Sequence, residues 1–235
     1  MAIKSDKSSW LAEYNAAGFI TKITITGLKG DSAVYTYTYT PDHLLAREVF
    51  SLGGEVICTQ YYGYENGVLM TRKSKYGNGN TATAWYSYNR NQQLTQITGI
   101  NQFTGVESKT VFNYDQKGNI IGESYFYDSA EGVTCQINYK NYDDKRNPLL
   151  TLKGLADVKL WMSFYKLGSR NNPGQIECIN YYDTDGDGLD DPNRDTDLRY
   201  TYMYNDGYPI RIKEVILAGR TNDPPKETLY SFIYE

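Results

Sequence analysis

The chain has 235 residues, a net charge of −4 and 24 tyrosines, against 7 phenylalanines and 3 tryptophans. The mild charge and the scattered basic residues exclude the basic footprint of a nucleic-acid-binding protein. No apolar run is long enough for a transmembrane helix, so none is predicted. No apolar segment follows the charged N-terminal residues, so no signal peptide is predicted either. A removed export signal would leave the same start. Abundant tyrosine, with threonine and valine, favours β-strands.

One pattern recurs along the chain: a strand that ends in tyrosine, a tight polar turn, and a strand that opens with an aliphatic residue. The tyrosines that end the first strand are Tyr14, Tyr39, Tyr64, Tyr88, Tyr114 and Tyr204, with degenerate copies at Tyr142 and Tyr182. The first five are spaced about 25 residues apart, the length of one hairpin and one connecting loop. The sequence therefore predicts a series of β-hairpins.

Alternate residues of these strands are aromatic. The aromatic residues that share a face with the repeat tyrosines are Tyr37, Tyr62, Tyr86, Phe112, Tyr202 and, in the last strand, Phe232. The residues between them are mostly small or polar. Because side chains of a strand alternate between faces, this pattern predicts a sheet with one packed aromatic face and one wetter face.

The turns carry the matching residues. Asn66-Gly67 and Asp206-Gly207 suit two-residue hairpin turns with positive φ, whereas Gly18 and Gly118 suit longer turns. Hairpins stacked in chain order give one all-β domain over residues 1–235, an antiparallel meander of about fifteen strands. A sheet of that length is expected to curl into a half-barrel or a closed barrel.

Residues 149–172 interrupt the repeat. Their apolar residues do not alternate strictly, and Pro148 and Pro173 bracket them. Leu152, Leu155 and Ala156 fit one or two turns of helix. We predict a short helical or irregular insert that packs against the sheet as a plug or flap.

An acidic segment, residues 183–197, resembles a calcium-binding loop. The expected ligands, at loop positions 1, 3, 5, 7 and 9, are Asp183, Asp185, Asp187, the Leu189 carbonyl and Asp191. Gly188 stands at position 6, where the loop turns sharply. Arg194 replaces the bidentate Glu of position 12, so we expect a structural calcium ion bound with a Kd of about 10⁻⁴–10⁻³ M. A solvated acidic loop is the alternative.

Two tryptophans are candidates for ligand binding. Trp85 points away from the Tyr88 face and Trp161 lies in the insert, so either could stack on a glycan or a peptide. Core packing is the alternative role for the aromatic face itself. A membrane-spanning barrel is disfavoured because the other face carries Thr, Lys, Arg and Gln.

No catalytic site is predicted. His43 is the only histidine and lies in a turn, with no nucleophile in a recognisable setting. An alternative is a carbohydrate-acting enzyme that uses acids on the wetter face. Its candidate carboxylates are Glu48, Glu55, Glu107, Glu123 and Glu177.

The cysteines show no metal or disulfide pattern. Counted from the repeat tyrosines, Cys58 and Cys178 share the aromatic face and Cys135 lies on the other. Because they are expected to lie far apart along the meander, we predict three unpaired thiols.

The repeat resembles the YD repeat of Rhs-type shells and teneurins, although an Rhs shell is far longer. The whole chain is more similar to a family of uncharacterised Bacteroides envelope lipoproteins with a porin-like β fold. The segments that carry this resemblance are 142–148, 171–173, 202–209 and the terminal 230–234. The resemblance implies export and a lipid-anchored precursor, with the membrane reached only through that anchor, and no established activity. We therefore expect a non-enzymatic secreted or cell-envelope binding or structural module.

Overall fold

A computed structural model describes residues 2–5, 8–27, 32–127, 132–145, 147, 161–162, 165–166, 169–182, 191–218 and 225–233. Every regular element in these ranges is a β-strand. Over the same ranges, no helix has the length and apolar character needed to cross a membrane.

The strands follow the order of the predicted hairpins. The first nine are β1 (Ala2–Ser5), β2 (Ser8–Tyr14), β3 (Ile20–Gly27), β4 (Ser32–Tyr39), β5 (Leu45–Leu52), β6 (Glu55–Glu65), β7 (Val68–Tyr76), β8 (Thr81–Tyr88) and β9 (Leu94–Asn101). The others are β10 (Glu107–Tyr114), β11 (Ile120–Tyr127), β12 (Cys135–Lys140), β13 (Trp161–Met162), β14 (Tyr165–Lys166), β15 (Gln175–Tyr182), β16 (Asp191–Asn205), β17 (Tyr208–Ala218) and β18 (Lys226–Ile233).

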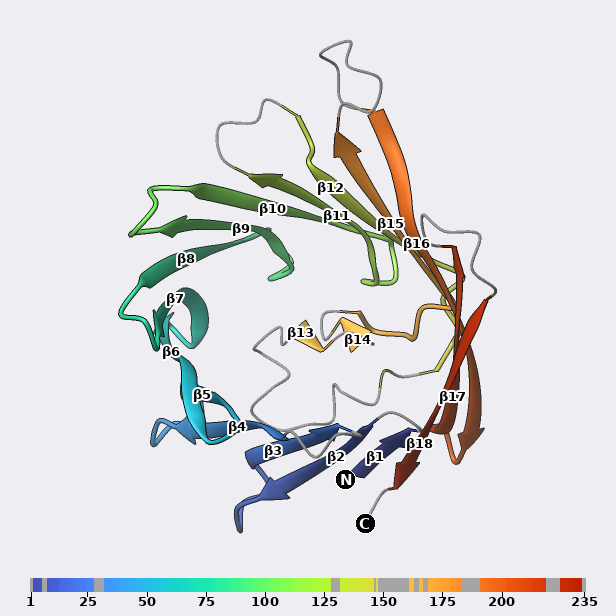
Figure 1. Ribbon diagram of the computed structural model, residues 1–235, viewed down its shortest axis with the longest axis horizontal. Helices are drawn as coiled ribbons and strands as arrows, with labels where there is room; N and C mark the ends of the chain where they lie inside the picture. Colours follow the sequence, from blue (N-terminus) through green and yellow to red (C-terminus); the bar gives the residue numbers. More distant parts are fainter. Residues whose placement is uncertain are drawn as a thin grey trace.

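Sixteen of these strands form one closed antiparallel barrel, in which each strand pairs with its neighbours in chain order except at two places (Figure 1). The barrel closes where β1 pairs with β18, with Ile3 opposite Phe232. At the other place β12 pairs directly with β15, because the chain between them forms the separate two-stranded sheet β13–β14. The all-β meander is confirmed, and closure resolves the choice between half-barrel and barrel.

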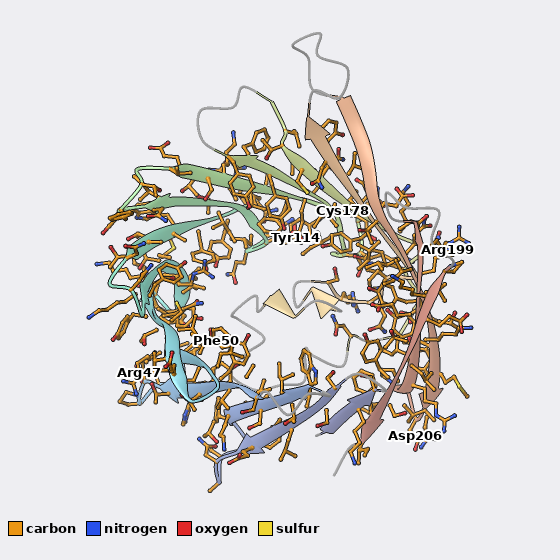
Figure 2. The ribbon with its side chains drawn as sticks, in the orientation of Figure 1. Arg47, Phe50, Tyr114, Cys178, Arg199 and Asp206 are labelled. Atoms are coloured by element: carbon orange, nitrogen blue, oxygen red, sulfur yellow. The ribbon has the colours of Figure 1, made fainter. Side chains whose placement is uncertain are left out.

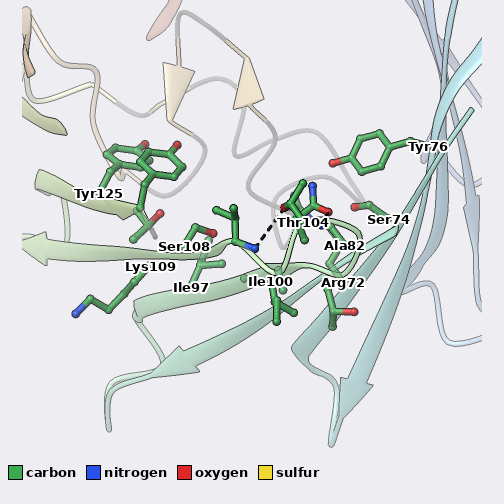
Figure 3. Close-up of a pocket in the computed structure, with 17 residues that line it drawn as sticks. Arg72, Ser74, Tyr76, Ala82, Ile97, Ile100, Thr104, Ser108, Lys109 and Tyr125 are labelled. Carbon is green, nitrogen blue, oxygen red and sulfur yellow. Dashed lines mark hydrogen bonds between the residues drawn. The ribbon is translucent and has the colours of Figure 1, made fainter. Parts of the chain in front are cut away.

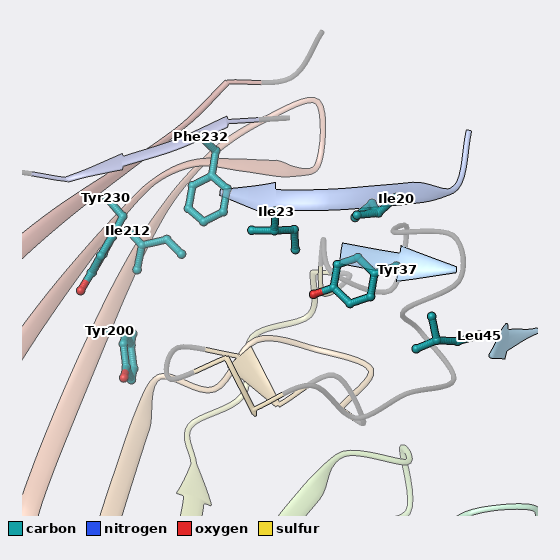
Figure 4. Close-up of a cluster of buried hydrophobic side chains, with 8 residues drawn as sticks. All are labelled: Ile20, Ile23, Tyr37, Leu45, Tyr200, Ile212, Tyr230 and Phe232. Carbon is teal, nitrogen blue, oxygen red and sulfur yellow. The ribbon is translucent and has the colours of Figure 1, made fainter. Parts of the chain in front are cut away.

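The aromatic face lines the inside of the barrel (Figures 2 and 4). Tyr37, Tyr86, Phe112 and Phe232 are buried, and the other two residues of the predicted aromatic row are partly buried. They pack in two clusters, one centred on β3, β4 and β17–β18, the other on β7–β12. The predicted parity is therefore confirmed, and the strands β13 and β14 are drawn inside this ring (Figure 1).

The same β-bulge occurs in each of the six hairpins whose first strand ends at Tyr14, Tyr39, Tyr64, Tyr88, Tyr114 or Tyr204. The register shifts beside the repeat tyrosine, so that Tyr39 pairs with Leu45 but Thr38 pairs with Arg47. Equivalent shifts occur in the hairpins that end at Tyr14, Tyr64, Tyr88, Tyr114 and Tyr204. A bulge adds one residue to a strand and so shifts the alternation of its faces by one. The side chain three positions after the buried aliphatic residue, Leu45 in this hairpin, therefore points inward. The side chain two positions after it points outward.

The repeat tyrosines tie each hairpin to the one before it. Five of their hydroxyls donate a hydrogen bond to the backbone carbonyl of the aliphatic residue at the preceding bulge, whereas the Tyr204 hydroxyl donates to the Asp143 carboxylate. The pairs are Tyr39 to Ile20 (2.6 Å), Tyr64 to Leu45 (3.0 Å), Tyr88 to Leu69 (2.9 Å), Tyr114 to Leu94 (2.9 Å) and Tyr142 to Ile120 (2.5 Å). This ladder explains why the repeat requires tyrosine where phenylalanine would fill the same volume.

Removing one hydroxyl of this ladder tests its contribution. The Tyr88→Phe substitution keeps the ring but leaves the Leu69 carbonyl without this donor, so the free energy of unfolding is expected to fall by about 1 kcal/mol. Urea denaturation of the two proteins measures the difference. The matched control is Tyr61→Phe, which removes the hydroxyl of a tyrosine that is 48% exposed and should change stability by less than about 0.5 kcal/mol.

The end of the insert is anchored by a buried polar network. The Ser169 hydroxyl accepts a hydrogen bond from the Ile120 amide at 3.1 Å, and the Asn171 amide donates to the Asn119 side chain at 2.9 Å. Asn172 donates through its side chain to the carboxylate of Asp143 and to the Tyr204 hydroxyl. The insert therefore rejoins the wall at a defined point. The helical turn predicted near 152–156 lies outside the described residues.

Candidate functional site

A shallow groove lies on the outer surface of β8–β11. Trp85, Thr98, Lys109 and Phe126 form one row across it, since each residue pairs with the next across adjacent strands. Trp85 is 45% exposed at one end, and the Lys109 ammonium lies 4.1 Å from the centroid of the Phe126 ring at the other. The groove has a volume of about 430 Å³. It offers an aromatic surface with hydroxyl, ammonium and carboxylate groups within reach.

Of the two predicted ligand-binding tryptophans, Trp85 faces outward as expected. The sequence did not predict the residues that share its groove. Lys109 and Phe126 lie far from Trp85 in the sequence, and only the strand register brings them into one row. The backbone of Trp161 opens the short strand β13 inside the barrel. The two tryptophans therefore do not share a site.

The predicted calcium loop lies mostly outside the described residues. The part outside the described residues includes Asp183, Asp185, Asp187 and Leu189. Asp191 is the first residue of β16, and its backbone pairs with that of Tyr182 on β15. In the remainder of the chain, no group of three or more Asp, Glu, His or Cys side chains is arranged to hold a metal ion.

A second hollow lies on the inner side of β7–β11 (Figure 3). Its floor consists of small inward residues, Ser74, Ala82, Ala84, Gly99 and Ser108, and its rim of Arg72, Tyr76, Tyr125 and Tyr127. The volume is about 450 Å³, within the range of small-molecule sites. No acidic residue is among those that line it.

Several acidic residues are buried, contrary to the expectation that strand-borne acids lie on the wetter face. Glu48 is 3% exposed and Glu123 is 1% exposed. Each lies three positions after a buried aliphatic, Leu45 or Ile120, so the bulge turns its side chain inward. Simple alternation from the aliphatic residue predicts the opposite face, and that part of the prediction is wrong.

Tyrosine hydroxyls donate hydrogen bonds to two buried carboxylates, those of Glu123 and Glu214. Glu123 accepts hydrogen bonds from Tyr125 at 2.6 Å and Tyr139 at 3.0 Å. Glu214 accepts in the same way from Tyr200 at 3.1 Å and from Tyr230 at 3.3 Å. Burial, and then the nearby carboxylate, raise the pKa of Tyr125, Tyr139 and Tyr200, so their hydroxyls remain protonated donors.

Glu48 has a different environment. Burial raises the pKa of its carboxyl group to about 7, although the charge of Arg72 opposes this shift. One of its oxygens, Oε2, has no hydrogen-bond partner, and neither does Nε of Arg72. Both residues point inward because both follow a bulge, beside Leu45 and Leu69 respectively. A buried, incompletely satisfied carboxyl of this kind makes stability sensitive to pH.

A close carboxylate pair occurs outside both hollows. Glu177 and Asp197 lie opposite each other on β15 and β16, and Gln175 Nε2 donates to both, at 3.2 and 3.1 Å. The Lys140 ammonium lies 2.5 Å from Glu177. This arrangement satisfies the buried charges through hydrogen bonds and an ion pair. Neither carboxylate lines the outer groove or the inner hollow.

His43 occupies a turn position, as predicted. Its φ of 66° matches the left-handed conformation that Gly18 and Gly118 adopt in the equivalent turns. Its ring stacks on Phe19 with centroids 4.9 Å apart. The two-residue turns are also confirmed, since Asn66 and Asp206 and the glycines after them all have positive φ.

Comparison with known proteins supports the fold. No protein-family model and no curated protein sequence matches the chain. A crystal structure of a porin-like protein from Bacteroides uniformis matches with a TM-score of 0.62 and 16% identity, covering 100% of this chain and 96% of that one. A crystal structure of a porin-like protein from Bacteroides vulgatus matches over 100% of this chain and 97% of that one, with 15% identity and a TM-score of 0.42. At these identities the first likeness establishes a shared all-β fold of porin-like type.

Proposed function

We propose that the protein is a non-enzymatic binding module of the cell envelope or the extracellular space, and that the outer groove at Trp85 binds a glycan. The observation that carries this proposal is the half-exposed Trp85 at the end of a row of polar and aromatic side chains. The ring offers a flat surface to the apolar face of a sugar, while Thr98, Glu107 and Lys109 offer hydrogen-bond donors and acceptors to its hydroxyls.

The carboxylates favour binding over hydrolysis. A glycosidase needs two carboxyl groups about 5–10 Å apart across the scissile bond. Glu107 is the one acidic residue among those that line the outer groove, and the inner hollow has none. Neither of these two hollows therefore has the paired acids that the enzyme alternative requires.

The outer wall favours an aqueous surrounding for the barrel. Lys22 and Glu13 form an ion pair of 2.8 Å on the outside of β2–β3, and Lys213 and Glu227 form one of 2.7 Å on the outside of β17–β18. A lysine on the lipid-facing side of a membrane barrel costs about 2–4 kcal/mol at the bilayer midplane. The interior, in contrast, is aromatic. We propose that any membrane attachment is through a lipid anchor on an exported precursor, as in the Bacteroides envelope lipoproteins that the sequence resembles.

A glycan array probed with the purified protein tests the proposal. Trp85→Ala should reduce binding at least about tenfold, since truncation of an aromatic side chain that stacks on a ligand commonly costs more than 1.4 kcal/mol. Thermal denaturation with and without millimolar calcium tests the proposed loop of residues 183–197, whose occupancy should raise the melting temperature by mass action.

The matched control is Phe103→Ala. Phe103 is an exposed aromatic, 75% accessible, in the turn between β9 and β10 and outside the groove. Its removal should leave glycan binding unchanged. Equal binding by the Trp85→Ala protein would reject the groove as the site, and turnover of a glycan would support the enzyme alternative.

A further inference from the structure

Two cysteine thiols meet on the inside of the wall. Cys135 lies on β12 and Cys178 on β15, and their sulfur atoms are 3.7 Å apart. Cys178 pairs with Ile137, two residues after Cys135, so the two cysteines are diagonal neighbours on one face. That face is the inner one, because Cys135 also pairs with the buried Tyr125. The prediction that they lie far apart on opposite faces is therefore wrong.

The failure has a local cause. Counting from Tyr142 places Cys135 on the opposite face, but β12 ends at Lys140 and Asn141 has a φ of 56°. This left-handed residue breaks the alternation between the strand and Tyr142. Within β12 itself, Cys135 shares its face with the buried Tyr139.

The two thiols lie where β12 pairs with β15, which we call the seam of the barrel. The chain runs directly from each wall strand to the next, except where β12 pairs with β15 and where β1 meets β18. Residues 141–174, which include β13 and β14, intervene between β12 and β15. Bringing these two strands together therefore costs more loop-closure entropy than forming any of the hairpins.

We propose that Cys135 and Cys178 form a disulfide that fixes this seam. Each thiol loses its hydrogen, and the two electrons of the pair reduce a disulfide of the glutathione class. The S–S bond of the oxidant breaks, an S–S bond forms between the two strands, and two small thiols leave with the two protons. Such a bond forms and persists in an oxidising compartment, which agrees with the proposed export of the protein.

The geometry needs a small adjustment. A disulfide has an S–S distance of about 2.0 Å, so the sulfurs must approach by about 1.7 Å. Rotation about the side-chain bonds supplies much of this movement. The register shift between Cys178 and Ile179 interrupts the regular ladder at the same point, where a bulged strand bends more readily.

The cross-link joins positions 43 residues apart and so restricts the unfolded chain. Oxidation of the full chain with glutathione disulfide should remove two hydrogen atoms from its mass. Peptide mapping without reduction should then recover one fragment pair that contains Cys135 and Cys178. The melting temperature of the oxidised protein should exceed that of the reduced protein by about 5–10 °C.

Three single substitutions make the test specific. Cys135→Ser and Cys178→Ser should each abolish both the mass change and the rise in melting temperature. Cys58→Ser should preserve both, because Cys58 lies on β6, away from the seam. Three alkylatable thiols after oxidation, or a cross-linked peptide containing Cys58, would overturn the proposal.

Discussion

Replacing Phe112 with alanine is expected to lower the free energy of unfolding by about 3–5 kcal/mol. Phe112 is 8% exposed and packs inside the barrel with Tyr86, Leu94 and Ile120. Truncation removes the transfer free energy of the ring and leaves a cavity that the paired strands around it cannot easily close. In a chain of this length the loss corresponds to a fall of about 10 °C in melting temperature.

The comparison is with Phe103→Ala, which removes the same side chain from an exposed turn. Urea denaturation of both variants separates burial from any general effect of losing an aromatic ring. Phe103→Ala should change the free energy of unfolding by less than about 0.5 kcal/mol. Similar values for the two variants would contradict the inward orientation of the aromatic face.

Stability should fall as the pH rises from about 4.5 to about 7, because of Glu48. Burial raises the pKa of this carboxyl to about 7 in the folded state, from its ordinary value of 4.5. Between these values the folded protein binds more protons than the unfolded chain, so raising the pH favours unfolding. The shift corresponds to a loss of about 3 kcal/mol at pH 8 relative to pH 4.

Glu48→Gln should remove this dependence and raise the stability at pH 8, since the amide has the shape of the carboxyl without its charge. The measurement is the urea midpoint at pH 5 and at pH 8 for both proteins. Glu13→Gln is the control, because Glu13 lies exposed beside Lys22 on the outer wall. If wild type and Glu48→Gln change in parallel between the two pH values, another group is responsible.

The sequence by itself determined the hairpins, their turns and the direction of the aromatic face. The alternation of aromatic and small residues in a segment such as Tyr86-Ser87-Tyr88 depends only on strand geometry. The positive φ of Asn66-Gly67 likewise follows from the chemistry of a two-residue turn. Local features of this kind are encoded within a few residues and do not depend on the rest of the chain.

Only the tertiary structure decided the closure of the barrel, the faces of Glu48 and Cys135, and the row that surrounds Trp85. Closure requires β1 to meet β18, at opposite ends of the chain. The two faces depend on a bulge and on a left-handed residue, each of which breaks a simple count along the strand. The row at Trp85 depends on the register of four strands at once. A shift of one residue in a strand exchanges its faces, so these features follow from pairing between strands and not from any one segment.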